Sequence, residues 1–178
     1  MIIKAYGLFW RHDEVLWNPG KGNKKYVDEQ FRLFGHIGKN LPNRRIADFR
    51  TQRGIYILYG DLGPYYAGLT REQTLGKRLK DHLEDEHADE WDRFSWFGFC
   101  SVKKGKDKYG LQLLKNMARV SMTKPHLVIK DIEAILVKAM ALRNVADSNF
   151  VHAERWEQLK LSEMEKYFPP HVLSDDGT

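Results

Sequence analysis

A β-hairpin that leads directly into a helix is the feature that most restricts how this 178-residue chain can fold. Residues 54–59 and 65–69 are rich in β-branched and aromatic side chains, and the intervening Asp61-Leu62-Gly63-Pro64 is a turn sequence. From Leu75 to Leu83 a leucine recurs at every fourth position, which predicts a helix with one face in the core. The hairpin and this helix are therefore the expected centre of the fold.

Other segments carry patterns of the same two kinds. Strand-like residues at 5–10 and 15–17 favour a short N-terminal hairpin, and residues 94–102 favour a further strand. The polar stretch 18–25 is typical of a loop, and residues 41–45 of a linker into the central hairpin. Helices are expected at four further places, which are residues 26–34, 110–120, 130–143 and 154–167.

Composition indicates a globular chain with a real core. Apolar residues make up 42% and charged residues 30%, and the length suits one domain with extensions. Cys100 is the single cysteine, which excludes an intramolecular disulfide and favours a reducing compartment. No apolar run reaches the roughly 18 residues of a membrane span, and the first residues lack the pattern of a signal peptide. We therefore expect a cytoplasmic protein with no membrane association.

The net charge of +5 is concentrated at one end of the chain. Residues 1–50 contain 10 Lys and Arg against 5 Asp and Glu, and the other 128 residues contain 19 of each. A basic segment of this kind suits an anionic partner such as nucleic acid, although a basic soluble surface without any target has the same composition.

Arg78 and His82 are candidate functional residues on the helix that follows the hairpin. They are four residues apart, so they lie on the same side of that helix, at the flank of its leucine face. A guanidinium suits phosphate, and an imidazole exchanges protons near neutral pH. Without further evidence, such a pair on an amphipathic helix is usually only solvated.

The two strands of the hairpin carry short tyrosine motifs, Gly54-Ile55-Tyr56 and Tyr66-Ala67-Gly68. The residues 76–82 and the run Ile132-Glu133-Ala134 follow in order. Together these motifs resemble the GIY-YIG nucleases, with Ala67 in place of a larger apolar residue, over roughly residues 52–150. The resemblance implies an α+β fold with a small three-stranded antiparallel sheet flanked by helices.

The same resemblance implies a divalent-metal-dependent endonuclease that hydrolyses DNA with Mg²⁺ or Mn²⁺. Tyr56 is then the proposed general base, Tyr66 positions water or phosphate, and Arg78 stabilises phosphate charge. His82 occupies a position held by His or Tyr in the family, and Glu133 is the metal ligand. The final polar residue of the family is an asparagine, for which Asn149 is the first choice and Asn144 the competitor.

The resemblance divides the chain into a basic N-terminal extension (1–50), a nuclease-like domain (51–150) and a C-terminal helix with a tail (151–178). The residues expected to contact nucleic acid are basic, namely Arg44, Arg45, Lys77, Lys80, Lys103 and Lys104. A single metal centre cuts one strand at a time, so a homodimer or a partner protein that supplies specificity is also possible.

Three alternatives remain open from the sequence. Residues 84–92 contain six acids and His87, for which a metal cluster is conceivable, although such a run is more often a solvated helix end. Because it should repel DNA, we expect this run to lie away from the cleft. The same fold could also serve as a nucleic-acid-binding or complex-assembly module that does not cut. An unrelated fold that carries the motifs by chance is the third alternative.

Overall fold

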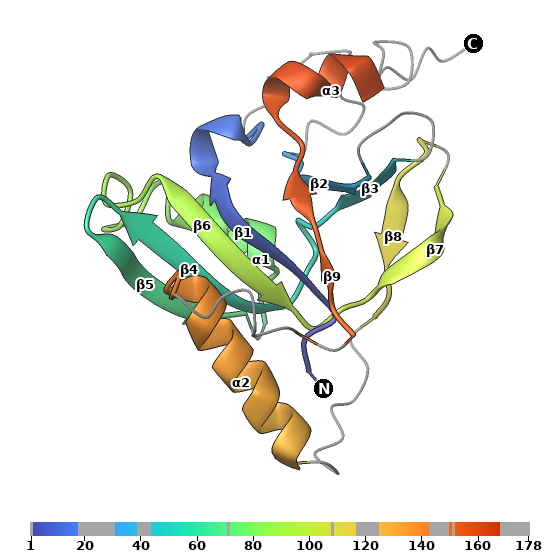
Figure 1. Cartoon of the computed structure of the whole chain (residues 1–178). Helices are drawn as coiled ribbons and strands as arrows, with labels where there is room; N and C mark the ends of the chain where they lie inside the picture. The colour runs from blue at the N-terminus through green and yellow to red at the C-terminus, as the bar shows by residue number, and fades with distance from the viewer. Residues whose placement is uncertain are drawn as a thin grey trace.

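The computed structural model consists mainly of β-strands (Figure 1). It describes residues 2–17, 31–38, 44–70, 72–107, 109–116, 125–142, 150 and 152–167. Within these ranges the chain forms two five-stranded sheets, three α-helices and one 3₁₀ turn. Both sheets are mixed, because each contains one parallel strand pair among antiparallel ones.

The first sheet contains the predicted hairpin. Its strand order is β5–β4–β6–β1–β9, with bounds β1 Ala5–Arg11, β4 Gly54–Gly60, β5 Gly63–Leu69, β6 Arg93–Gly98 and β9 Glu154–Arg155. Strand β4 pairs with β5 on one side and β6 on the other, both antiparallel. The hairpin predicted from residues 54–69 is therefore confirmed, and it forms one edge of this sheet.

The second sheet is built from short strands that lie far apart in the sequence. Its order is β10–β2–β3–β8–β7, with bounds β2 Phe34–Ile37, β3 Arg45–Asp48, β7 Val102–Lys106, β8 Gln112–Leu114 and β10 Glu157–Gln158. Residues from both ends of the chain thus contribute strands to both sheets. The expected divisions at residues 50 and 150 do not coincide with these sheets.

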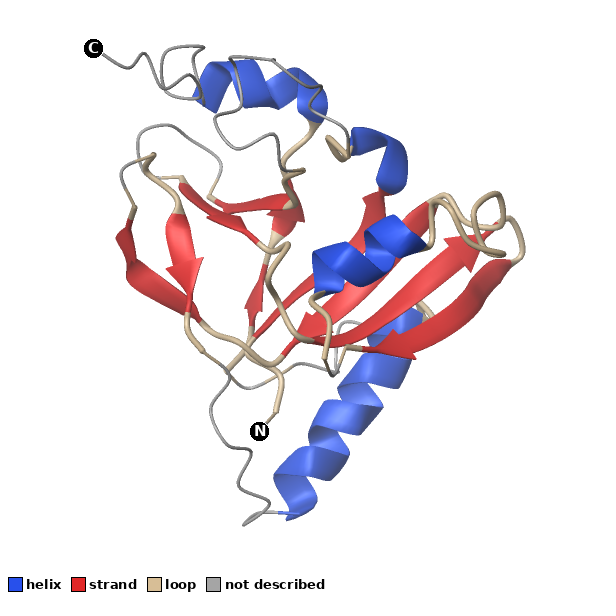
Figure 2. Cartoon of the chain, turned by 180° about the vertical axis from the view of Figure 1, so that it is seen from behind, coloured by secondary structure: helices blue, strands red, loops and turns tan. Residues whose placement is uncertain are grey.

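The two faces of the first sheet are covered by different helices. Tyr56 and Leu58 of β4 share one core cluster with Leu75 and Leu79 of α1 (Leu75–Asp81). The alternate residues of the same strand pack with Ala134 and Ala139 of α2 (Pro125–Ala139). Figure 2 shows α1 in front of this sheet and α2 behind it, in agreement with the alternation of side chains along a strand.

Aromatic packing joins the two sheets on the α1 side. Trp10, Phe49 and Trp156 belong to the same buried cluster as Tyr56. The ring of Phe49 lies 4.4 Å from that of Trp96 and 5.0 Å from that of Trp156, measured between centroids. Large rings here fill the space between layers, so the sheets form one continuous core.

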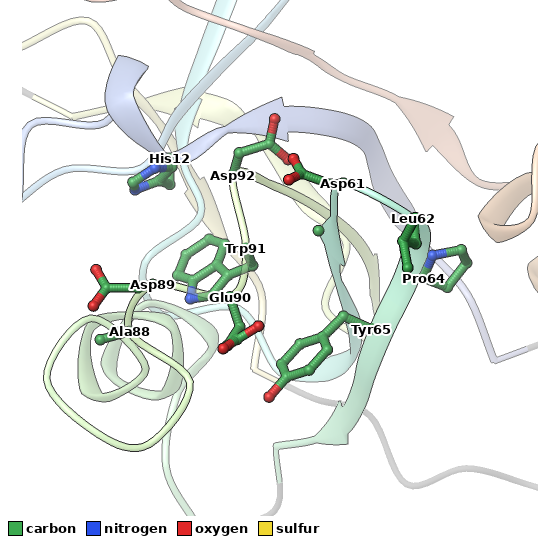
Figure 3. Close-up of a pocket in the computed structure, with 12 residues that line it drawn as sticks. His12, Asp61, Leu62, Pro64, Tyr65, Ala88, Asp89, Glu90, Trp91 and Asp92 are labelled. Carbon is green, nitrogen blue, oxygen red and sulfur yellow. The ribbon is translucent and has the colours of Figure 1, made fainter.

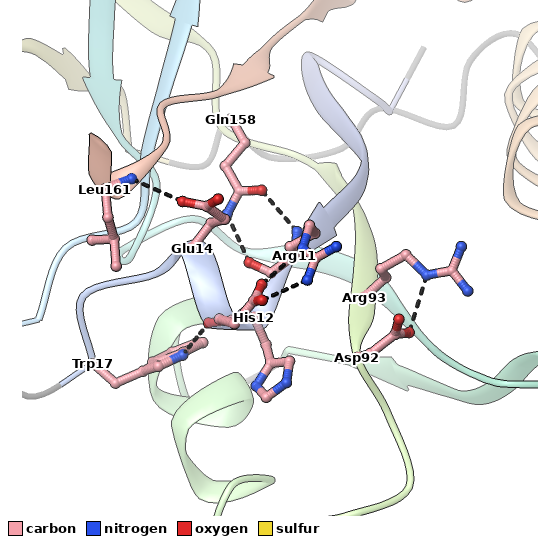
Figure 4. A network of polar contacts seen from close by, with 9 residues as sticks. Arg11, His12, Glu14, Trp17, Asp92, Arg93, Gln158 and Leu161 are labelled. Carbon is pink, nitrogen blue, oxygen red and sulfur yellow. Dashed lines mark hydrogen bonds and ion pairs between the residues drawn. The ribbon is translucent and has the colours of Figure 1, made fainter. Parts of the chain in front are cut away.

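Polar contacts reinforce the junction near the 3₁₀ turn η1 (His12–Glu14), as Figure 4 shows. The amide group of Gln158 bridges the strand end of β1, because its Oε1 accepts from Arg11 N at 2.7 Å and its Nε2 donates to Arg11 O at 2.8 Å. Leu161, the first residue of α3 (Leu161–Tyr167), donates its N–H to Glu14 at 3.1 Å. The C-terminal segment is therefore bound to the first strand.

The expected small three-stranded sheet flanked by helices is wrong. Residues 1–50, which were expected to form an extension, contribute to both sheets, because β1 lies between β6 and β9 in the first sheet and β2 and β3 belong to the second. Residues 15–17 do not pair with β1 as a hairpin, because β1 pairs with β6 and β9. Long-range strand pairing of this kind leaves no local signal in the sequence.

Several helix predictions are corrected as well. In the described residues, the region 110–120 contains strand β8, and 154–160 contains β9 and β10 before α3 begins. The segment 26–34 ends in strand β2, and its residues 26–30 lie outside the described part, as does the loop 18–25. The edges of β1 and β2 offer backbone partners to residues 154–158, and those pairings outweigh the local helical spacing. None of the described helices has the length and apolarity to cross a bilayer.

Candidate functional site

The glycines of the two tyrosine motifs allow close packing on both sides of β4. A Cβ at Gly68 would lie 2.2 Å from the hydroxyl of Tyr56, so the ring of Tyr56 crosses β5 where there is no side chain. A Cβ at Gly54 would lie 2.0 Å from the carbonyl oxygen of Phe97 on β6. Both motifs therefore need glycine for close packing, independently of any chemistry.

A hydrogen-bond chain runs from buried Tyr56 on β4, through buried His82, to exposed Asp85 in the turn that follows α1. Tyr56 Oη lies 2.7 Å from His82 Nε2, and His82 Nδ1 lies 2.7 Å from Asp85 Oδ2. The Asp85 carboxylate is only an acceptor when ionised, so His82 carries its proton on Nδ1 and accepts from the Tyr56 hydroxyl. In this hydrogen-bond chain a hydroxyl donates to an imidazole, which in turn donates to a carboxylate, as in enzymes where a base activates a hydroxyl and a carboxylate orients the base.

The surroundings of this chain shift its pKa values in consistent directions. Burial lowers the pKa of His82 despite the opposing effect of Asp85, and burial raises the pKa of Tyr56 to about 12. Partial desolvation opposes ionisation of Asp85, but bonds from the His87 backbone and from His82 lower the pKa of that carboxyl overall. At neutral pH the phenol and the imidazole are therefore uncharged and the carboxylate is ionised.

Tyr66 and Arg78 lie at the Tyr56 end of the hydrogen-bond chain. The Tyr66 ring centroid is 6.1 Å from that of Tyr56 and 5.2 Å from that of His82. Desolvation would lower the pKa of Arg78, but its interactions with the hydroxyls of Tyr56 and Tyr66 raise it. Both side chains are partly exposed, whereas Tyr56 and His82 are buried, so Tyr66 and Arg78 form the solvent side of the cluster.

The turn after α1 adds two polar residues from the acidic run. His87 Nδ1 lies 3.0 Å from Tyr65 Oη, and its ring packs against that of Tyr66 at a tilt of 41°, with centroids 4.7 Å apart. The backbone N–H of His87 donates to Asp85 Oδ1 at 2.9 Å. The expectation that this run lies away from the site is therefore wrong for Asp85 and His87. Backbone hydrogen bonds such as Asp85 N to Asp81 O, at 3.1 Å, hold the turn to α1.

Glu133 is not brought to this cluster. It is an exposed residue of α2, and α2 covers the opposite face of the first sheet from Tyr56. A metal held by Glu133 therefore does not fit beside Arg78 and His82 in this arrangement. Asn149 and Asn144 lie outside the described residues.

The expected phosphate-contacting residues are divided among three places. Lys77 and Lys80 are on α1, where Lys77 forms an ion pair with Asp81 and Lys80 lies 5.5 Å from the ring centroid of Phe31. Lys103 and Lys104 are exposed on β7. These four side chains remain accessible to an anionic ligand.

The two arginines of the expected linker have partners within the protein. Arg45 contacts both carboxylate oxygens of Glu154, at 2.5 and 3.1 Å, and Arg44 lies 3.7 Å from Glu163. The guanidinium of Arg45 connects β3 to β9, and that of Arg44, the residue before β3, reaches α3. Both residues therefore have a structural role in addition to any contact with nucleic acid.

Two surface pockets differ sharply in charge. One, of about 570 Å³, lies beside the hairpin turn and is lined by Asp61, Asp89, Glu90 and Asp92 around Trp91 (Figure 3). The other, of about 620 Å³, is lined mainly by basic and polar residues, including Lys4, Arg45, Lys104, Lys106 and His152. Only the second suits a phosphate backbone, and neither is lined by Tyr56, Arg78 or His82.

Comparison with known proteins yields no relative. No protein-family model matches the chain, and searches of curated proteins and of solved structures find no significant match. The resemblance to GIY-YIG nucleases therefore depends on the motif residues themselves. Of these, the structure brings together Tyr56, Tyr66, Arg78 and His82, and it adds Asp85, for which the spacing His82-x-x-Asp85 was the available signal.

Proposed function

We propose that this chain is a GIY-YIG-type endonuclease that hydrolyses DNA phosphodiester bonds at the cluster of Tyr56, Tyr66, Arg78 and His82. The observation that carries the proposal is the contact of both motif tyrosines with the helix residues Arg78 and His82 on one face of the sheet. Their order along the chain and their position around one hydroxyl are what the resemblance requires of these four residues. The proposal concerns the site and does not depend on the fold that the resemblance implied.

The hydrogen-bond chain suggests how water would be activated. A water molecule gives a proton to Tyr56 Oη while the phenol proton passes to His82 Nε2, and Asp85 stabilises the resulting imidazolium. The water oxygen forms a bond to phosphorus as the bond to the leaving sugar oxygen breaks, and that oxygen takes a proton from solvent. Arg78 supplies fixed positive charge to the phosphorane-like transition state.

Burial of the inner residues imposes a condition on this step. Tyr56 is 0% and His82 1% exposed, so a phosphate meets Tyr66 and Arg78 first. Binding must move one of these two outer side chains before water can reach Tyr56. Any Mg²⁺ or Mn²⁺ would enter with the phosphate, and we assign it no protein ligand because Glu133 lies across the sheet.

The basic surfaces support DNA as the substrate. Lys77 and Lys80 lie on the same helix as Arg78, and the basic pocket at β3 and β7 offers a second region of contact. We place the enzyme in the cytoplasm because it has one buried, free cysteine, Cys100. A second copy or a partner protein would be needed to cut both strands at once.

A plasmid-nicking assay tests the proposal. Supercoiled DNA is incubated with the protein in Mg²⁺, Mn²⁺ or EDTA, and nicked circles are quantified. Removal of one transition-state donor typically costs about 10²–10³ in rate, so Arg78→Ala should lose that much. Glu133→Ala, an exposed substitution on the other face, should retain the wild-type rate within about two-fold.

Two results would contradict the proposal. The first is equal nicking by Arg78→Ala and the wild type. The second is the absence of cleavage on duplex, branched and single-stranded DNA. Arg155→Ala is the matched control, since it removes an exposed arginine that pairs with Glu157 and lies outside the cluster.

The burial of Tyr56 and His82 favours a second candidate, a nucleic-acid-binding module on which the cluster is only structural. In that case Arg78 and Tyr66 would bind phosphate without hydrolysis. DNA affinity that falls with salt and with Arg78→Ala, together with no metal-dependent nicking, would identify this alternative.

A further inference from the structure

A second set of donor atoms lies beside the Tyr56 hydrogen-bond chain. One ring nitrogen of His82, one ring nitrogen of His87 and one carboxylate oxygen of Asp85 all lie within 4.8 Å of one another. No other such group of three occurs among the described residues. A tetrahedral ion with metal–nitrogen distances near 2.0–2.1 Å separates its ligands by roughly 3.3 Å, so small side-chain rotations would close this set around a cation.

We propose that His82, Asp85 and His87 form a binding site for Zn²⁺ or a similar borderline transition-metal ion. Imidazole nitrogens suit such ions, whereas Mg²⁺ prefers oxygen ligands in octahedral geometry. Two histidines and one carboxylate make a three-ligand set with the fourth position left for water. This is a different site, with different donors, from the Glu133 site that the family resemblance implies.

Partners outside the donor set already orient its side chains. His82 Nδ1 faces Asp85 at 2.7 Å, and its other nitrogen is in contact with Tyr56 Oη. His87 Nδ1 contacts Tyr65 Oη at 3.0 Å, and its Nε2 lies 3.8 Å from the exposed carboxylate of Glu86. The second oxygen of Asp85 accepts from the His87 backbone N–H at 2.9 Å. Each proposed ligand therefore has the outer hydrogen bond that metal ligands commonly need.

The positions of the ligands also allow an ion to enter. The side chain of His82 is only 2% exposed, but that of Asp85 is 36% and that of His87 16% exposed. The three ligands lie within one turn that is fixed at its ends by backbone bonds, including Ala88 N to Asp85 O at 3.1 Å. The indole of Trp91 holds the buried end by donating to His82 O at 3.2 Å.

Metal binding would change the proton arrangement of the neighbouring site. An ion at His82 Nδ1 replaces the proton that otherwise points to Asp85, so Nε2 must carry the remaining proton and donate to Tyr56. His82 then cannot accept a proton from Tyr56. If the proposed nuclease step is correct, Zn²⁺ at this site inhibits it, but the metal site itself does not depend on that function.

Direct metal binding by the full chain provides the test. Metal-free protein is titrated with Co²⁺, whose visible absorption reports tetrahedral coordination, and Zn²⁺ affinity is then measured by displacement. The wild type should bind one equivalent without a thiolate absorption band, and millimolar Mg²⁺ should not compete. Two variants each remove one ligand. His87→Phe keeps a ring that packs against Tyr66, and Asp85→Asn keeps the acceptor for the His87 N–H. Each should weaken Zn²⁺ binding by at least about 10–100-fold, which is the usual effect of losing only an outer hydrogen-bond partner of a ligand.

The matched control is His152→Gln, which changes an exposed histidine outside the group. It should bind Zn²⁺ as the wild type does, and thermal unfolding of each metal-free variant shows that it is folded. The proposal is overturned if the wild type binds no more tightly than His87→Phe, or if Mg²⁺ displaces Co²⁺. In nicking assays Zn²⁺ should inhibit the wild type but not His87→Phe. If no protein nicks DNA, the nuclease proposal fails while the Co²⁺ titration still decides the metal site.

Discussion

The two faces of the first sheet have the same backbone but very different chemistry. On the α1 face, Tyr56 and Tyr66 meet Arg78 and His82 in a hydrogen-bonded cluster. On the α2 face, alternate residues of the same strand meet Ala134 and Ala139 in apolar contact. The side that a residue occupies is decided by the two-residue period of the strand, so Tyr56 and Ile57 belong to different parts of the molecule.

This difference shows why motif residues that follow one another in the expected order along the sequence need not lie close together in the fold. Tyr56, Arg78 and His82 converge because a hairpin and the helix directly after it are local structures. Glu133 comes from α2, which is distant from the hairpin in the sequence, and that helix covers the other face. The comparison predicts different responses when equivalent groups on the two faces are changed.

The largest difference in stability is expected at high pH and comes from Tyr56. Its pKa is about 12 in the folded protein, mainly because the phenol is buried, against 10.0 ordinarily. Between these values the unfolded chain releases a proton that the folded chain retains. Stability is therefore complete below pH 10 and falls by about 2–3 kcal/mol as pH rises through 12.

Urea unfolding from pH 9 to 12, with EDTA present, measures this effect as a difference between the wild type and Tyr56→Phe. Other tyrosines and the lysines titrate in both proteins, so only the Tyr56 contribution differs. If both proteins lose stability in parallel over this range, Tyr56 is not held neutral by its surroundings.

A smaller effect is expected from filling the space under the Tyr56 hydroxyl. In Gly68→Ala the new methyl group would lie 2.2 Å from Tyr56 Oη, so the ring must move away from His82. Overpacking of this kind typically costs about 1–3 kcal/mol. The free energy of unfolding from urea titration measures the cost.

Gly105→Ala is the control for this substitution. Gly105 is also in a strand, but a Cβ there meets no atom within 4 Å. Its stability should change by less than about 0.5 kcal/mol. Equal stability of the Gly68 and Gly105 variants would show that Tyr56 does not cross β5 as described.

The prediction from sequence succeeds where contacts are local and fails where they are not. The spacing of Arg78 and His82, and the turn at 61–64, placed the α1-face residues correctly. Asp85 was overlooked because it lies in a run of acids, and such runs are usually solvated. The turn after α1 brings the Asp85 carboxylate to 2.7 Å from His82 Nδ1, and the sequence pattern does not predict that turn.

The strands of the second sheet illustrate the same limit. Strand β8 pairs with β3 across more than sixty positions, and β10 pairs with β2 across more than one hundred and twenty. Such pairings depend on the edges that other strands leave available. A window of neighbouring residues contains no information about these edges, so the local pattern at residues 154–160 indicated a helix instead.

The smallest effect is expected on the α2 face, from Tyr59→Phe. Tyr59 Oη donates to Ala139 O at 2.8 Å and is the polar contact on this face that most resembles the one at Tyr56. Its loss leaves a carbonyl without that donor, which should reduce the free energy of unfolding by about 1 kcal/mol. DNA nicking should remain at the wild-type rate, because the group lies across the sheet from Arg78. A Tyr59→Phe variant that remains stable but loses nicking would show that the α2 face takes part in the chemistry, and the separation of the two faces would then no longer describe how the site works.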